Sequence, residues 1–258
     1  MIGAYLAELL VFPFFLIFAR LGAAVMVFPA LSDMAVPVRF RLLMAVAISA
    51  VFFPLLQPGL PAMPGQTGAM LALVLGEIFV GILMALGARL FIAAFAVAGE
   101  IIAFMAGFQS ATLFDPQSAS NTVAPTLFLS ITAAAMLLAL NLHHDLIRAV
   151  AASYVAFPAG VWPEIEDVNM AVIEIVAQLF ALGVQLAAPI ILVGLLANAL
   201  FGVLGRLIPQ LQVFYVSIPV SITLSLLVLA AGLSAMMELW TDTVAGKMSV
   251  FQIEESLR

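Results

Sequence analysis

The sequence predicts an all-α integral membrane protein of about six long, kinked hydrophobic helices or hairpins. Hydrophobic residues make up 66% of the 258 residues and charged residues only 9%, whereas soluble domains contain about 25% charged residues. Six apolar runs approach or exceed the roughly 20 residues that a helix needs to cross a bilayer. Proline inside four of the runs predicts bends, because it removes a backbone donor: Pro13, Pro125, Pro189 and Pro219.

The first three runs cover residues 4–29, 40–56 and 69–107. No Lys or Arg precedes Arg20, so the first run predicts a retained helix and not a cleavable signal peptide. As a helix, the third run would be nearly 60 Å long at about 1.5 Å per residue, which is roughly twice the hydrocarbon thickness of a bilayer. It must therefore tilt, bend or leave the membrane.

The last three runs cover residues 123–142, 170–204 and 213–239. The fourth run contains no ionisable residue, and the fifth is again longer than a simple span. Loop cations do not orient the chain by the positive-inside rule, because a six-span arrangement divides them evenly. Arg39, Arg41 and Arg206 fall on one side, and Arg148, Lys247 and Arg258 fall on the other.

No catalytic constellation is visible, so the chain is not expected to be an enzyme. It has no cysteine, no HExxH or GxSxG sequence and no glycine-rich phosphate loop. The adjacent His143 and His144 would point about 100° apart on a helix and would not converge on a metal ion. With Asn141 and Asp145 they predict a polar helix end at the membrane surface. No cofactor, metal or nucleic-acid partner is expected, since the net charge is -6.

Ionisable residues inside apolar runs are costly, so each one suggests a function. Two interpretations are open. The carboxylates titrate along a proton or ion path, with Glu77 and Glu100 as its members, or the acids are compensated by Arg20, by Arg89 or by a neighbouring subunit. Compensation is favoured, because acids and bases occur in similar numbers. The residues concerned are Arg20, Glu77, Arg89 and Glu100, together with Glu8 and Glu174.

Small residues recur at every fourth position near the end of the third run. Gly99, Ala103 and Gly107 would share one helix face, on which another backbone can approach closely. The partner on that face is a helix of the same chain or, alternatively, a helix of another subunit.

A polar stretch, residues 107–125, then separates the third run from the fourth. It contains a single charge, Asp115. Loop statistics alone favour an ordinary exposed connection.

Several distinctive blocks follow one another along the chain: Arg20 followed by Pro29, then Pro37-Val38-Arg39, GEIFVG at 76–81, AGEIIAFMAGFQSATLFDP at 98–116, NLHHDLIRAVAASYVAFPAG at 141–160 and RLIPQLQVF at 206–214. In this order the blocks resemble the FliR family of flagellar type III secretion export-gate proteins. The sequence departs from the family at His143, where relatives often have Gly, and at VSIP, where Gly is common.

The resemblance implies a subunit of a helical export gate around a pore, assembled with FliP and FliQ. Residues of about 1–168 would resemble FliP, about 170–240 would form a hairpin that resembles FliQ, and 241–258 would be a tail. The stretch 107–125 would be the family's plug, with apolar side chains that seal and polar ones that tolerate water. The plug and gate residues would be Phe108, Gln109, Ser110, Leu113, Phe114, Asp115 and Pro116.

The resemblance also implies further partners. The turn between the fifth and sixth runs would contact FlhB at the cytoplasmic entrance through Arg206, Pro209, Gln210 and Gln212. FlhA, the flagellar basal body, membrane lipids and unfolded export substrates would complete the surroundings, in the bacterial inner membrane. The alternatives are the equivalent gate of a virulence injectisome and, third, a proton-coupled transporter.

Overall fold

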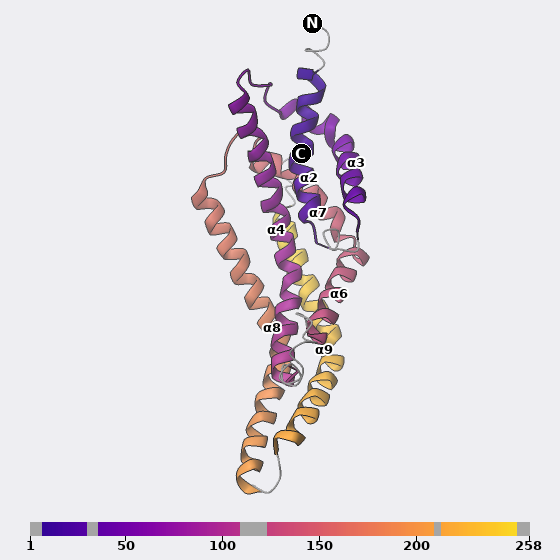
Figure 1. Cartoon of the computed structure of the whole chain (residues 1–258), viewed down its shortest axis with the longest axis vertical. Coiled ribbons are helices and arrows are strands. Elements are labelled where there is room, and N and C mark those ends of the chain that lie inside the picture. Colours follow the sequence, from indigo (N-terminus) through magenta and orange to yellow (C-terminus); the bar gives the residue numbers. More distant parts are fainter. Residues whose placement is uncertain (1–6, 30–35, 109–122, 209–212, 252–258) are drawn as a thin grey trace. The chain divides into compact units, whose positions relative to one another are not determined.

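The computed structural model describes residues 7–29, 36–108, 123–208 and 213–251, and these residues contain helices and turns but no strand. This confirms the predicted fold class. Within these residues, up to six helical segments are long and apolar enough to cross a membrane. The helices (Figure 1) are the π-helical Ala7–Val11, the 3-10 turn Gln57–Gly59, and α2 (Phe12–Val27), α3 (Val38–Leu56), α4 (Thr67–Ala106), α6 (Ala124–Ala139), α7 (Leu142–Ala156), α8 (Ile165–Leu207) and α9 (Val213–Phe251).

Two helices extend beyond the apolar runs that predicted them. Helix α8 begins at Ile165, within the acidic stretch before residue 170, and α9 continues to Phe251. Acidic residues are favourable near a helix N-terminus, which explains the early start of α8. In the extension of α9, the hydroxyls of Thr241 and Thr243 donate hydrogen bonds to the backbone carbonyls of Met237 and Leu239. Apolar composition therefore predicts the segment that could cross a membrane, but both helices continue past the ends of that segment.

The fourth run contains only the first of two helices. Helix α6 ends at Ala139, and α7 begins at Leu142 after a bend of 73°. Asn141 lies at the bend with φ of 58°, a left-handed conformation that Asn adopts more readily than most residues. The predicted polar helix end at Asn141 is thus a corner, and the polar residues after it begin a further helix.

The prolines do not all act as predicted. Pro189 and Pro219 lie inside α8 and α9, and Pro54 lies inside α3. Pro13 is the second residue of α2, which begins directly after the π-helical turn. The bend predicted at Pro125 is wrong, because this residue is second in α6, where its missing N–H has no partner to lose.

The chain forms two compact units. The first contains Met1–Phe91, Ala134–Ile175 and Gly246–Arg258, and the second contains Ile92–Ala133 and Val176–Ala245. In the first unit α2 lies along α3 (Figure 1), and its core includes Ile17, Leu21, Ala24, Ala85 and Val150. In the second, the fully buried Trp240 meets Phe95 with ring centroids 5.6 Å apart. The division into parts that resemble FliP and FliQ stays a prediction.

Candidate functional site

A fully buried ion pair joins α2 to α4 in the first unit. Arg20 Nε donates to Glu77 Oε2 at 2.7 Å, and Arg20 Nη2 donates to Glu77 Oε1 at 3.1 Å. The two side chains are only 1% and 2% exposed. A bidentate arginine–carboxylate pair is among the strongest hydrogen-bonded contacts in proteins. Glu77 thus follows the compensation interpretation, with Arg20 as its partner.

The same guanidinium also binds α7. Arg20 Nη1 donates to Ser153 Oγ at 3.1 Å, and Nη2 donates to the carbonyl oxygen of Phe157 at 2.9 Å. The ring of Tyr154 covers the guanidinium, with Arg20 Cζ 3.8 Å from the ring centroid. One buried arginine therefore joins α2, α4 and α7. Its guanidinium donates hydrogen bonds to oxygen acceptors and lies against an aromatic ring, so the buried charge is compensated.

Gly81 explains how α4 comes close enough for this pair to form. A Cβ atom at Gly81 would collide with the backbone carbonyl oxygen of Arg20 and would lie 3.2 Å from Ala23 Cβ. Only glycine permits this approach. Gly81 lies one helical turn after Glu77, so the close crossing and the ion pair fall at the same level of α4.

The other predicted intramembrane charges are not gathered at this pair. Arg89, Glu100 and Glu174 are all exposed. Arg89 and Glu174 each take part in an interaction within the fold. The side chain of Glu8 lies outside the described residues. The structure brings together Arg20 and Glu77 from the predicted set, and it adds Ser153 and the Phe157 carbonyl, which the sequence analysis missed.

The predicted plug begins at a well-defined helix end. Gly107 has φ of 79°, its N–H donates to the Phe104 carbonyl at 3.1 Å, and the Phe108 N–H donates to the Ala103 carbonyl at 3.0 Å. These two bonds form a Schellman motif, which satisfies carbonyls at the end of α4. Phe108 is half-buried. The other predicted plug residues lie outside the described residues: Gln109, Ser110, Leu113, Phe114, Asp115 and Pro116.

Two helices hold α4 just before that end. A Cβ at Gly99 would collide with Thr126 Cα and lie 2.9 Å from Thr126 N, so α4 and α6 cross backbone to backbone. On α8, a Cβ at Gly194 would lie 3.2 Å from Met105 Cβ. Ala103 is fully buried. Helix packing at Gly99 therefore occurs within the chain, the first of the two alternatives given for it.

We expect Gly107→Ala to lower the free energy of unfolding by about 1–2 kcal/mol, because an L residue pays that amount for left-handed backbone. Space is not the cause, since nothing lies within 4 Å of a Cβ at Gly107. Thermal unfolding of the purified full chain measures the effect. Gly202→Ala, at an equally open position inside α8, serves as the control and should not destabilise. Equal loss in both variants would contradict the backbone explanation.

The remaining predicted positions are partly described. Arg206 is exposed in the last turn of α8, where a cation favours the helix dipole, and Pro209, Gln210 and Gln212 lie outside the described residues. The ring centroids of His143 and His144 are 4.1 Å apart. Within the described ranges, no group of three His, Asp or Glu residues is placed to hold a metal ion.

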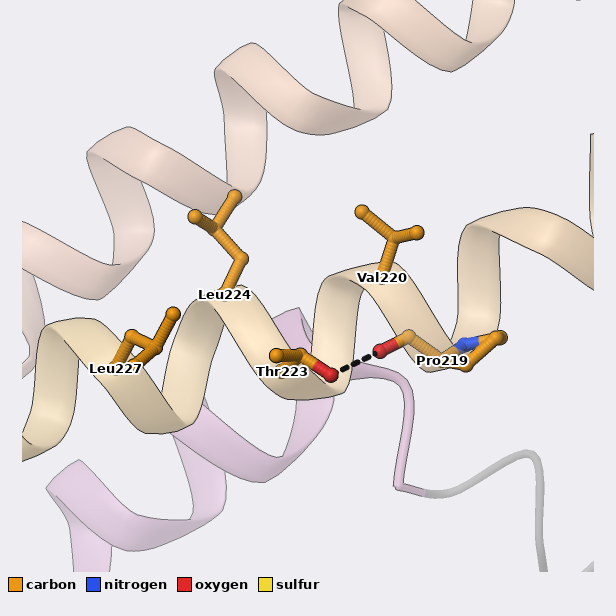
Figure 2. Close-up of a pocket in the computed structure, with 5 residues that line it drawn as sticks. All are labelled: Pro219, Val220, Thr223, Leu224 and Leu227. Carbon is orange, nitrogen blue, oxygen red and sulfur yellow. Dashed lines mark hydrogen bonds between the residues drawn. The ribbon is translucent and has the colours of Figure 1, made fainter.

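An open hollow of about 320 Å³ on α9 offers no binding chemistry. It is lined by Pro219, Val220, Thr223, Leu224 and Leu227 (Figure 2). The Thr223 hydroxyl, the polar side-chain group in this lining, donates to the Pro219 carbonyl at 2.8 Å. The hollow therefore presents apolar side chains and no group that would orient a polar ligand.

Long apolar helices joined by glycine crossings and a buried ion pair define a polytopic membrane protein, and comparison with known proteins gives its class. Residues 11–246 match the family model of bacterial export proteins, family 1. The flagellar biosynthetic protein FliR of Caulobacter vibrioides is 35% identical over 92% of this chain and 94% of its own. FliR of Escherichia coli is 30% identical over 82% and 80%, and FliR of Bacillus subtilis is 28% identical over 86% of each. The chain belongs to the FliR family.

Proposed function

We propose that the chain is a noncatalytic core subunit of the bacterial flagellar type III protein export apparatus that forms part of the export pore and its gate. The observation that carries the proposal is family membership across residues 11–246. In this role it acts in the bacterial inner membrane and basal body with FliP, FliQ, FlhB and FlhA, and unfolded flagellar proteins pass through the gate. The relatives named above are flagellar proteins, which favours this system over an injectisome.

The ends of the stretch 107–125 support the gate part of the proposal. It begins at the Schellman motif of Gly107 and returns into α6, whose Thr126 crosses α4 at Gly99. A gate needs such fixed ends. Its closed state is favoured by only a few kcal/mol, because a larger bias would keep the pore shut without an energy source.

Deletion of residues 110–120 tests the gate directly. We expect cells that produce this variant to leak ions across the membrane and to lose motility, because the seal is removed while α4 and α6 remain. Ion leakage, swimming in soft agar and co-purification of partner subunits are measured together. A chain that lacks residues 252–258 is the control and should not leak.

Assembly decides how the deletion result is interpreted. If the partner subunits still co-purify and leakage equals that of the control, the stretch is only a connection and the gate role is wrong. If deletion of the whole chain leaves flagella intact, the export role itself is wrong.

A further inference from the structure

The chain enters α2 through the π-helical turn Ala7–Val11. Pro13, the second residue of α2, explains why the regular helix does not extend further back. Proline has no N–H, and in a regular helix its ring clashes with the carbonyl of the residue four positions earlier, which here is Leu9. The Leu9 carbonyl must therefore accept a hydrogen bond from another part of the chain or from water.

Gln57, at the end of α3, supplies the missing donor. Its Nε2 donates to the Leu9 carbonyl oxygen at 3.0 Å, across 48 positions of sequence. Next to this bond the rings of Phe14 and Phe53 meet, with centroids 5.9 Å apart. The turn before α2 is thus fastened to the far end of α3, within the first unit.

The backbone of Gln57 has a conformation that its neighbour in sequence disfavours. Gln57 has helical dihedral angles, φ of -50° and ψ of -43°, and its N–H donates to the Phe53 carbonyl. Pro58 follows directly, and a proline disfavours helical backbone at the residue before it. The side-chain bond to Leu9 therefore helps to keep Gln57 helical, and loss of that bond would favour an extended Gln57.

This attachment of α2 is weak compared with the one two turns further along the helix. Leu9 is 46% exposed and the Gln57 bond is exposed as well, so water competes for both partners. A neutral hydrogen bond of this kind shifts an equilibrium by only about fivefold. Arg20, by contrast, is held by several buried bonds. The start of α2 can therefore open locally while the buried ion pair stays intact.

We propose that Gln57 is the latch of a two-position joint at the start of α2. In the latched position its carboxamide takes the place of the N–H that Pro13 lacks and ties the turn Ala7–Val11 to α3. In the released position the Leu9 carbonyl binds water, Gln57 leaves the helical conformation, and the turn moves independently of α3. This joint does not depend on the export function, since it concerns contacts within one chain.

Spin labels on either side of the joint measure the two positions. The sequence contains no cysteine, so Leu10→Cys and Leu55→Cys, both at exposed positions, supply the labelling sites. Double electron–electron resonance on the purified full chain gives the distribution of distances between the labels. We expect a latched and a released population, and Gln57→Leu should change their ratio about fivefold toward release, the effect of one lost hydrogen bond.

Gln57→Glu separates the lost donor from lost packing. An ionised carboxylate only accepts hydrogen bonds, so it cannot bind the Leu9 carbonyl although it fills nearly the same space as the amide. At neutral pH this variant should favour release at least as strongly as Gln57→Leu. The control is Gln66→Leu, at an exposed glutamine in the same connection between α3 and α4, which should leave the distribution unchanged. If both Gln57 variants match this control, the proposal is overturned.

Pro13→Ala tests whether Gln57 replaces the missing N–H. Alanine returns a donor to the helix at the position that serves the Leu9 carbonyl, and it removes the proline ring. In this background Gln57→Leu should change the ratio by less than about twofold, because the two substitutions act on one contact. An undiminished effect would mean that the latch does not compensate for Pro13, and the proposal is then wrong. Should Pro13→Ala not fold, because Pro13 is buried, the two Gln57 variants in the parent chain still decide the proposal.

Discussion

Arg20→Ala is expected to lower the free energy of unfolding by about 3–5 kcal/mol, because it leaves a buried carboxylate without its cation. Glu77 is 2% exposed and receives two hydrogen bonds from Arg20. The Ser153 hydroxyl and the Phe157 carbonyl would lose their donor as well. Since whole domains are stable by only about 5–15 kcal/mol, little folded chain should accumulate. Immunoblots of membranes and thermal unfolding of the purified chain measure the loss.

The chain contains a matched control for this variant. Arg148 pairs with Asp145 at 3.3 Å, but the arginine is 76% exposed, and such surface pairs contribute only about 0–1 kcal/mol. Arg148→Ala should therefore have a free energy of unfolding close to that of the parent chain. The double variant Arg20→Met with Glu77→Leu should recover much of the loss, because it removes both charges together. Equal stability of Arg20→Ala and Arg148→Ala would contradict the structural role of the buried pair.

The long apolar helices could be predicted closely from the sequence. The run 69–107 corresponds to α4, Thr67–Ala106, and the run 40–56 corresponds to α3, Val38–Leu56. Continuous apolar composition is a strong signal, because a bilayer requires about 20 such residues per helix. The C-terminal end of α4 was predictable for a second reason, since Gly107 supplies the left-handed residue on which helices commonly end.

Helix α7 was not predicted, because its composition resembles that of an exposed surface segment. His143, His144, Asp145 and Arg148 gather in its first half, and this polarity hid the helical spacing of the residues that it buries. Val150, Ala151 and Ser153 are nonetheless buried. The spacing from Val150 to Ser153 was the signal available, since residues three apart share a helix face.

The ion pair could be anticipated in kind but not in geometry. The sequence identified Arg20 and Glu77 as costly charges and suggested compensation, yet the two residues are 57 positions apart. Their meeting depends on how α2 and α4 cross. The carbonyl of Phe157 was invisible to sequence reasoning, because every residue has a carbonyl and only the tertiary fold selects one.

The regular spacing of Gly99, Ala103 and Gly107 concealed three different roles. The spacing correctly placed the first two on a packed face. Gly99 admits the backbone of α6, Ala103 is buried, and Gly107 ends the helix with a positive φ. Sequence alone cannot separate a glycine needed for close approach from one needed for its conformation, because both requirements select the same residue.

Gly99→Ala is expected to lower the free energy of unfolding by about 1–3 kcal/mol, the usual cost of overpacking. The new methyl group would meet the Thr126 backbone, which is part of α6 and cannot rotate away as a side chain can. Helix propensity acts in the opposite direction, since Ala is more favourable than Gly in a helix by about 1 kcal/mol. The measured change in the free energy of unfolding is therefore the cost of overpacking minus this gain. Thermal unfolding of the purified full chain gives the sign and size.

Gly232→Ala is the control that separates crowding from propensity. Gly232 lies inside α9 and in the same unit, with nothing within 4 Å of a Cβ, so the substitution should be neutral or stabilising by up to about 1 kcal/mol. Opposite signs at the two glycines would identify the α4–α6 crossing as the cause. Under the proposed gate role, Gly99→Ala should also increase ion leakage in cells, because this crossing joins the two helices that flank the stretch 107–125. Stabilisation by both substitutions would mean that α4 and α6 can separate at no cost, and the crossing would then not support the proposed gate role.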